Sequence, residues 1–176
     1  GKSGLERGFE KRTSLKDSIL VPFCPESTLS GIGYTDFIPA VWYHRTVTLT
    51  SRELSGNVYL HFGAVDYDCR VYVNGMEAGR HLGGYVSFAF EISSLLHEGE
   101  NHLTVYAEDD TRSPLQPTGK QSDKFDSYGC FYTRTTVIWQ TVWLEFTPKA
   151  HIKSAQYYPN ISDGTLTIKA CVSGEG

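Results

Sequence analysis

Two neighbouring stretches, Val58-Tyr-Leu-His-Phe62 and Tyr67-Asp-Cys-Arg-Val-Tyr-Val-Asn-Gly75, alternate strictly between two sets of side chains. Successive side chains of a β-strand point to opposite faces of the sheet, so this alternation predicts two half-buried strands. Asn74-Gly75 closes the second stretch with the dipeptide that best tolerates positive φ at both central positions of a hairpin turn. The chain is therefore predicted to turn there and to return over Met76 to Arg80.

The same period of two continues on both sides of this hairpin. An earlier strand is predicted over Val41 to Thr50, and two later ones over Val86 to Ile92 and Leu103 to Ala107. A further strand is predicted over Val137 to Phe146, with Ile138, Val142, Leu144 and Phe146 on one face and Trp139 and Trp143 on the other. The residues predicted to be buried are Val58, Leu60, Phe62, Val71, Val73, Phe88, Phe90, Leu103 and Val105.

No segment carries a sustained helical apolar stripe, so the fold class is predicted to be all-β. About eight short strands with long connections and no βαβ alternation favour a jelly-roll β-sandwich over residues 1–148. Beyond Pro148, two strands over Ile152 to Tyr158 and Leu166 to Val172 are too few to bury a core alone. Residues 149–176 are therefore predicted to begin a second β-sandwich.

Composition narrows the class of function. The chain has 176 residues, 40% hydrophobic and 20% charged, which is typical of a globular protein. A net charge of -4 with scattered Lys and Arg argues against a nucleic-acid partner, and no apolar run approaches the roughly 20 residues of a membrane span. The four cysteines form no C-x-x-C pair, so they are predicted to be free thiols rather than zinc or redox ligands.

The stretch from Asp109 to Arg134 is rich in Pro, Gly, Ser and Asp and shows no periodicity. A loop of this length in a compact domain usually binds a ligand or a partner.

An ordered set of short phrases carries a family resemblance. It comprises Ile19 to Ser27 (ILVPFCPES), Ser30 to Gly33 (SGIG), Val41 to Arg45 (VWYHR), Leu60 to Tyr67 (LHFGAVDY), Val71 to Gly75 (VYVNG), Gly83 to Phe88 (GGYVSF), Gly99 to Leu103 (GENHL), Gly119 to Gln121 (GKQ) and Ile138 to Glu145 (IWQTVWLE). Together these phrases cover roughly residues 5–147. The set resembles the N-terminal sugar-binding domain of bacterial β-galactosidases and β-glucuronidases of glycoside hydrolase family 2.

The resemblance implies a jelly-roll domain of the galactose-binding-domain-like type, followed by an immunoglobulin-like sandwich and a (β/α)8 barrel. On this interpretation the chain is a non-catalytic domain that scaffolds and helps shape the substrate pocket of the barrel. Its expected partners are the two downstream domains and a carbohydrate substrate, a galactoside or a glucuronide, in a bacterial, cytoplasmic enzyme that could be a homo-oligomer. The alternative interpretation is an autonomous carbohydrate-binding module.

The chemistry of retaining glycosidases needs two carboxyl groups about 5 to 5.5 Å apart. The resemblance places both in the barrel, so no catalytic residue is assigned here and the chain alone is predicted to be inactive. The pairs Asp66/Asp68 and Asp109/Asp110 are interpreted as strand-end and turn acids. By the resemblance, Gly83-Gly84 occupies the place of the carboxylate that binds sodium in the large β-galactosidases, so no metal is expected. No cofactor is expected either.

The candidate substrate-lining or interdomain residues are Asp126, Tyr132 and Arg134. They supply a carboxylate, a phenol and a guanidinium, the groups that hold sugar hydroxyls or brace a neighbouring loop. The resemblance implies that their loop approaches the sugar pocket of the parent enzyme. Trp139 and Trp143 are expected on one strand face, where they serve packing or stack on a sugar.

Two departures from the family pattern lead to further expectations. Family members have Gly where this chain has Val137, and a β-branched residue does not accept a positive φ without strain, so the turn there is expected to differ. The family also has a strand upstream of the region matched here, and without it a sheet edge is expected to be exposed.

Overall fold

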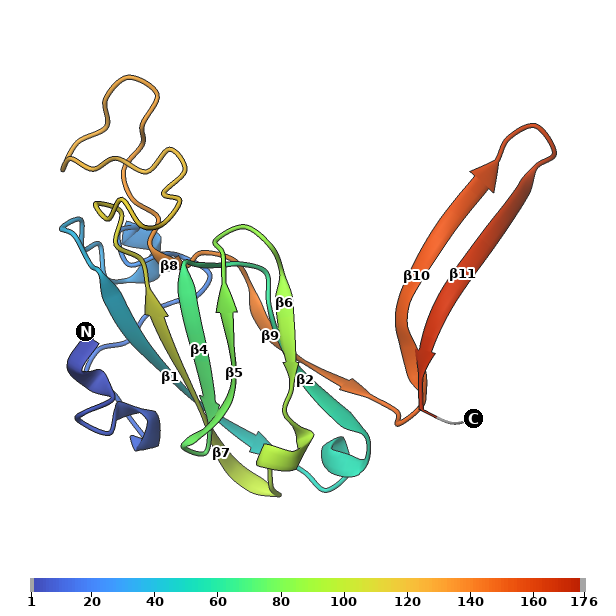
Figure 1. Cartoon of the computed structure of the whole chain (residues 1–176). Coiled ribbons are helices and arrows are strands. Elements are labelled where there is room, and N and C mark those ends of the chain that lie inside the picture. Colours follow the sequence, from blue (N-terminus) through green and yellow to red (C-terminus); the bar gives the residue numbers. More distant parts are fainter. Residues whose placement is uncertain (1, 175–176) are drawn as a thin grey trace.

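The structure is a computed structural model that describes residues 2–174 (Figure 1). Within these residues the strands are β1 Ala40–Leu49, β2 Asn57–Phe62, β3 Val65–Asp66, β4 Asp68–Val73, β5 Met76–Leu82, β6 Phe88–Glu91, β7 Gly99–Glu108, β8 Val137–Ile138, β9 Val142–Thr147, β10 His151–Asn160 and β11 Thr165–Ser173. The helical segments are single 3-10 turns: η1 Lys2–Gly4, η2 Phe9–Lys11, η3 Thr28–Ser30, η4 Glu53–Ser55 and η5 Ser93–Leu95. The predicted all-β class is confirmed, and the described residues contain no helix able to cross a membrane.

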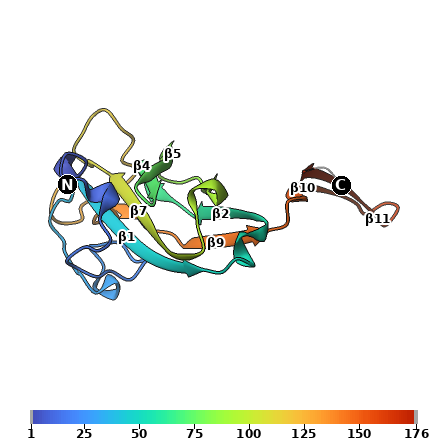
Figure 2. The same ribbon diagram turned by 90° about the horizontal axis from the view of Figure 1, so that it is seen from below.

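Two antiparallel sheets form the body, with strand orders β1-β7-β4-β5 and β6-β2-β9 (Figures 1 and 2). Their inner faces share one core, to which β2 and β4 contribute the side chains that alternation predicted. Seven predicted core residues are buried: Val58, Leu60, Phe62, Val71, Val73, Leu103 and Val105. Phe88 and Phe90 are half-buried and pack against the same cluster. The β-sandwich prediction is therefore confirmed.

The outer face of the four-stranded sheet is also covered, which the alternation did not predict. Trp42 and Tyr72 point away from the core, yet they are buried, because Phe9 and Leu15 of the N-terminal segment pack over them. The Trp42 ring lies 4.8 Å from that of Tyr106 and 5.8 Å from that of Phe9 in η2. A Cβ at Gly4 would come within 2.1 Å of the indole, so glycine permits this close approach.

The predicted strand over Val137 to Phe146 is wrong in one respect, because it is two strands. β8 pairs with β3, whereas β9 pairs with β2, and the chain changes sheet partners between them. The expected change of turn at Val137 is also absent: Val137 takes a φ of 63°, in the left-handed region, and is fully buried. Phe146, predicted to face inward, is 41% exposed near the end of β9, where the sandwich ends.

The last two strands form a separate hairpin that extends away from the sandwich (Figure 1). Its cross-strand pairs place a fully apolar set on one face: Ile152, Ala155, Tyr157, Pro159, Leu166, Ile168, Ala170 and Val172. Most of these side chains are exposed, since the described residues provide nothing to cover them. The hairpin is joined to the body by the Asn57 amide, which donates to the Pro148 carbonyl at 3.2 Å, and by contact between the rings of Tyr59 and His151.

Candidate functional site

The loop between β7 and β8, residues 109–136, projects from one end of the sandwich (Figure 1, yellow to orange). It is folded on itself: bridges join Gln121 to Tyr132 and Tyr128 to Phe131. The buried Ser122 hydroxyl donates to the carbonyl of Asp126 at 2.8 Å and accepts from the amide of Lys124. These local bonds give the loop a defined shape.

Arg134 is the internal support of this loop. Its side chain is 2% exposed, and its guanidinium donates to the carbonyls of Thr35, Lys124 and Phe125. The same group lies 4.3 Å from the centre of the Phe37 ring. Arg134 therefore joins the loop to the segment before β1, and its bonding groups are directed into the domain.

Asp126 and Tyr132 lie at the surface of the same loop. The Tyr132 side chain is 41% exposed, while its backbone pairs with Lys120 and Ser122. The structure thus brings the three candidate residues into one folded loop, with two at its surface and Arg134 inside.

A buried polar cluster lies beneath the loop, where sequence reasoning had placed only separate turn and strand-end acids. The Gln121 side-chain nitrogen donates to Asp66 Oδ2 and to Asp109 Oδ2, both at 3.1 Å. Gln116 donates to the other oxygen of Asp109 at 2.8 Å. The GKQ phrase of the sequence contains the bridging residue, Gln121. The pairing of Asp66 with Asp109 was not predictable in the same way, because it depends on the sheet, which brings β3 beside the end of β7.

The environment changes the acidity of both carboxyl groups. Burial, and after it the charge of Asp109, raise the pKa of Asp66 to about 7. Burial likewise raises the pKa of Asp109 to about 6, against the opposing effect of the amide bonds from Gln121 and Gln116. Both groups therefore titrate near neutral pH, although both are too enclosed to reach a sugar.

Gly84 lies directly against this cluster. A Cβ there would be 2.4 Å from Asp66 Oδ1, so the glycine allows the carboxyl group to be buried at this position. The Gly84 carbonyl accepts a hydrogen bond from the Trp139 indole at 2.9 Å. Trp139 is thus hydrogen-bonded within the domain, whereas Trp143 is 44% exposed. The two tryptophans therefore do not form one surface on which a sugar could stack.

Residues 2–174 contain no group of three His, Cys, Asp or Glu side chains placed to hold a metal ion.

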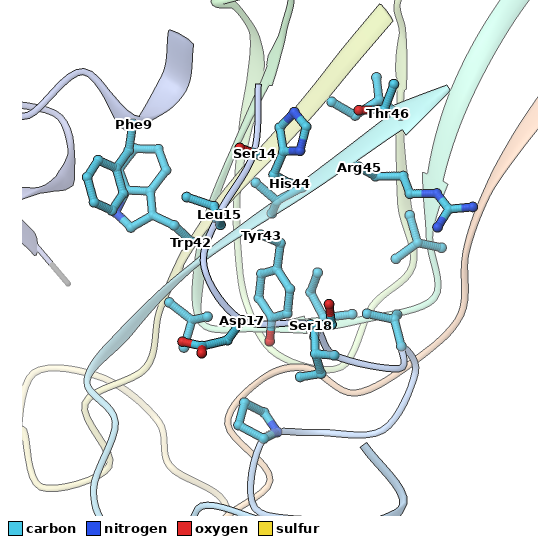
Figure 3. A pocket seen from close by; sticks show the side chains of 18 of the residues that line it. Phe9, Ser14, Leu15, Asp17, Ser18, Trp42, Tyr43, His44, Arg45 and Thr46 are labelled. Atoms are coloured by element: carbon cyan, nitrogen blue, oxygen red, sulfur yellow. The ribbon is translucent and has the colours of Figure 1, made fainter. Parts of the chain in front are cut away.

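Two of the hollows on the surface of the described residues are relevant to the site. The smaller one, of about 290 Å³, lies within the loop and includes Thr111, Gln121, Asp123 and Tyr128. The larger one, of about 1340 Å³, is an open cleft between β1 and β9, crossed by residues 12–21 (Figure 3). Tyr43, Val105, Val142 and Leu144 give it an apolar floor. Asp126, Tyr132 and Arg134 line neither hollow.

The cleft follows from an unequal number of strands. The sheet of β1 has four strands, but that of β9 has three, and within the described residues β9 pairs only with β2. One edge of β9 is therefore open beside the cleft. The upstream strand, and the sheet edge that it would cover, remain predictions.

Comparison with known proteins assigns the family. Residues 29–128 match the model of the "Glycosyl hydrolases family 2, sugar binding domain". Among curated proteins, a putative β-glucuronidase of Formosa agariphila is 28% identical over 152 residues, and a β-galactosidase of Thermoanaerobacter pseudethanolicus is 30% identical over 118 residues. These alignments cover 83% and 66% of this chain, but only 17% and 15% of those proteins.

Among solved structures, a β-glucuronidase from Ruminococcus gnavus in complex with D-glucaro-d-lactam has the same fold over 99% of this chain. The TM-score is 0.73 and the identity 20%, and the match covers 32% of that protein. The family-model match covers more than half of the 176 residues, including the strands from β1 to β7. The chain therefore belongs to glycoside hydrolase family 2, as its N-terminal sugar-binding domain.

Proposed function

We propose that the chain is the non-catalytic domain of a retaining β-glycosidase of the β-glucuronidase or β-galactosidase type. Its role is to scaffold the catalytic domain and to complete the substrate pocket with the 109–136 loop. Relatives carrying this domain are named β-glucuronidases and β-galactosidases and are several times longer than this chain. The observation that carries the proposal is the loop itself, which is folded from within by Arg134 and presents Asp126 and Tyr132 at its surface.

Catalysis is proposed to lie elsewhere in the protein. The carboxyl groups that lie near each other here, Asp66 and Asp109, are buried on either side of one amide, where neither can reach a glycosidic bond. The isolated chain is therefore expected not to hydrolyse aryl β-glucuronides or β-galactosides. Turnover above a mock-purified control, lost on substitution of an acid in this chain, would contradict this.

The hairpin of β10 and β11 is proposed to begin an immunoglobulin-like sandwich at residue 149. This proposal is supported by the apolar face of the hairpin, which needs a second sheet to bury it.

A bacterial, cytoplasmic parent is proposed as well. The four cysteines are free, as the sequence predicted, and free thiols persist in a reducing compartment.

The pocket role is tested in the full-length enzyme with the variants Asp126→Asn and Tyr132→Phe. Each is expected to lower kcat/KM for an aryl glycoside by about tenfold, the effect of losing roughly 1.4 kcal/mol of transition-state binding. Asp17→Asn, an exposed acid on the N-terminal segment, is the matched control and should leave kcat/KM unchanged. Wild-type kinetics in both loop variants would reject the pocket role.

A second function is an autonomous carbohydrate-binding module, favoured by one observation. On the outer face of the β6-β2-β9 sheet, Trp143 is exposed and stacks on His61 at 4.8 Å, beside Tyr59. Calorimetric titration of the isolated chain with galactose, lactose and glucuronate separates the two functions. The scaffold role predicts a Kd weaker than about 1 mM. Saturable micromolar binding that is lost in Trp143→Ala would instead establish a binding module.

A further inference from the structure

Asp66 and Asp109 form a buried carboxyl pair with no neighbouring cation to balance it. They are 3% and 1% exposed, and within residues 2–174 no lysine or arginine forms an ion pair with either. The other charged groups that raise the pKa of Asp109 are themselves acids, Glu26 from the N-terminal segment and Asp110 just after β7. The nearby Tyr85 phenol, before β6, has its own pKa raised by burial and by the charges of the pair. Two negative charges at this place would therefore repel each other in a medium of low polarity.

Within residues 2–174, one amide is the only side chain that bridges the two groups directly. Gln121 has two N–H bonds, and it uses one for Asp66 and one for Asp109. The second oxygen of Asp66, Oδ1, is buried and has no hydrogen-bond partner. When Asp66 is protonated, the pair carries one negative charge. When both groups are ionised, the second negative charge has no group nearby to compensate it.

The same amide holds both sides of the loop. Its oxygen accepts from the Thr135 backbone N–H at 2.9 Å, and Gln121 itself bridges to Tyr132. Gln116, earlier in the loop, donates to Asp109 as well. The carboxyl pair is thus the place where three separate parts of the loop meet the sandwich.

We propose that the Asp66–Asp109 pair is a proton-dependent anchor of the 110–136 loop. The pair holds the loop in place while the two carboxyl groups share one proton, and it releases the loop when both groups are ionised. The proton comes from solvent and returns to it, and no other bond is made or broken. When both carboxylates are charged, solvation is favoured over burial, so water enters and the contacts of Gln121 and Gln116 weaken. Below neutral pH the loop is held in place, and above it the loop becomes mobile.

This proposal concerns the order of the loop and stands independently of any role in a sugar pocket. It is tested on the 176-residue chain by NMR hydrogen exchange of the loop amides, at pH values from about 5 to about 8.5, with each rate divided by the intrinsic rate at that pH. Protection of the Thr135 and Ser122 amides is expected to fall by about tenfold or more across this range. The amides of β4 and β7 should keep their protection.

The variant Asp66→Asn mimics the protonated carboxyl group, so it is expected to keep the loop protected up to the highest pH. Asp17→Asn removes an exposed carboxylate and should leave the wild-type transition in place. Constant loop protection in the wild type, or an unchanged transition in Asp66→Asn, would overturn the proposal.

A second measurement covers the case in which Asp66→Asn does not fold. In wild-type protein with labelled Asp carboxyl carbons, the pair is expected to titrate in two steps, the upper one near the transition of the loop amides. A single step below about pH 5 for both carboxyl carbons would equally overturn the proposal, since both groups would then be charged wherever the loop is ordered.

Discussion

Val137 shows how strongly the core can constrain a single residue. Its φ of 63° suits glycine and is unfavourable for a β-branched side chain, at a cost of about 1–3 kcal/mol. Its side chain is nevertheless fully buried in the main core, where burying a valine contributes about 1.5–3 kcal/mol. The two effects are of similar size, so this chain can carry valine at a left-handed position that would suit glycine.

The substitution Val137→Gly therefore separates strain from burial. It loses the buried side chain but relieves the left-handed backbone, whereas Val65→Gly, in the strand paired with β8, loses a buried valine with no such relief. In urea denaturation, Val137→Gly is expected to cost about 1–3 kcal/mol less than Val65→Gly. Equal losses would mean that Val137 is not strained.

The acids beneath the loop also predict how global stability depends on pH. The pKa of Asp66 is raised to about 7 and that of Asp109 to about 6, so the folded state binds protons that the unfolded state has already released. Their stabilising contribution is complete below the unfolded pKa, near 4, and is lost as pH rises through the folded values. The urea midpoint should fall from pH 5 to pH 8, at about constant m, and fall less in Asp66→Asn. A midpoint that rises over this range would contradict the burial argument.

At the scale of the element, the 109–136 loop depends on one arginine more than on another. Arg134 and Arg112 both lie over the Phe37 ring, at 4.3 and 4.1 Å, but only Arg134 is buried and bonded to three backbone carbonyls. Lysine keeps the charge but not the planar set of donors. Arg134→Lys is therefore expected to cost about 2 kcal/mol or more and to speed exchange in residues 120–136. Arg112→Lys should change stability by less than about 0.5 kcal/mol, and similar effects of the two variants would argue against this role of Arg134.

How far the sequence predicts these elements depends on the range of the interaction. The strands β2, β4, β5 and β7 were predictable, because alternation and the Asn74-Gly75 turn are local signals. The division between β8 and β9 was not, since it depends on which sheet each half pairs with. The burial of Trp42 and the contact between Asp66 and Asp109 were likewise hidden, as both join segments far apart in the sequence. The loop was identified by composition alone, but its inner and outer residues were not distinguished.

At the scale of the whole molecule, the sandwich and the hairpin of β10 and β11 have different sources of stability. The sandwich has a closed core, whereas the hairpin leaves its apolar face exposed. Removing residues 149–176 is therefore expected to change the free energy of unfolding of the sandwich by less than about 1 kcal/mol. Urea denaturation of the two lengths checks this, and a larger loss would show that the hairpin stabilises the sandwich.

The short connection between the sandwich and the hairpin has a consequence for motion. Pro148 to Ala150 are the only residues between β9 and β10, and the Asn57 amide donates to the carbonyls of both Pro148 and Lys149. A connection this short, with two of its carbonyls hydrogen-bonded to β2, cannot act as a flexible hinge. The two parts should therefore rotate in solution as one elongated particle with a single tumbling time. In the longer enzyme proposed above, a domain that begins with this hairpin would take its orientation from the β6-β2-β9 sheet.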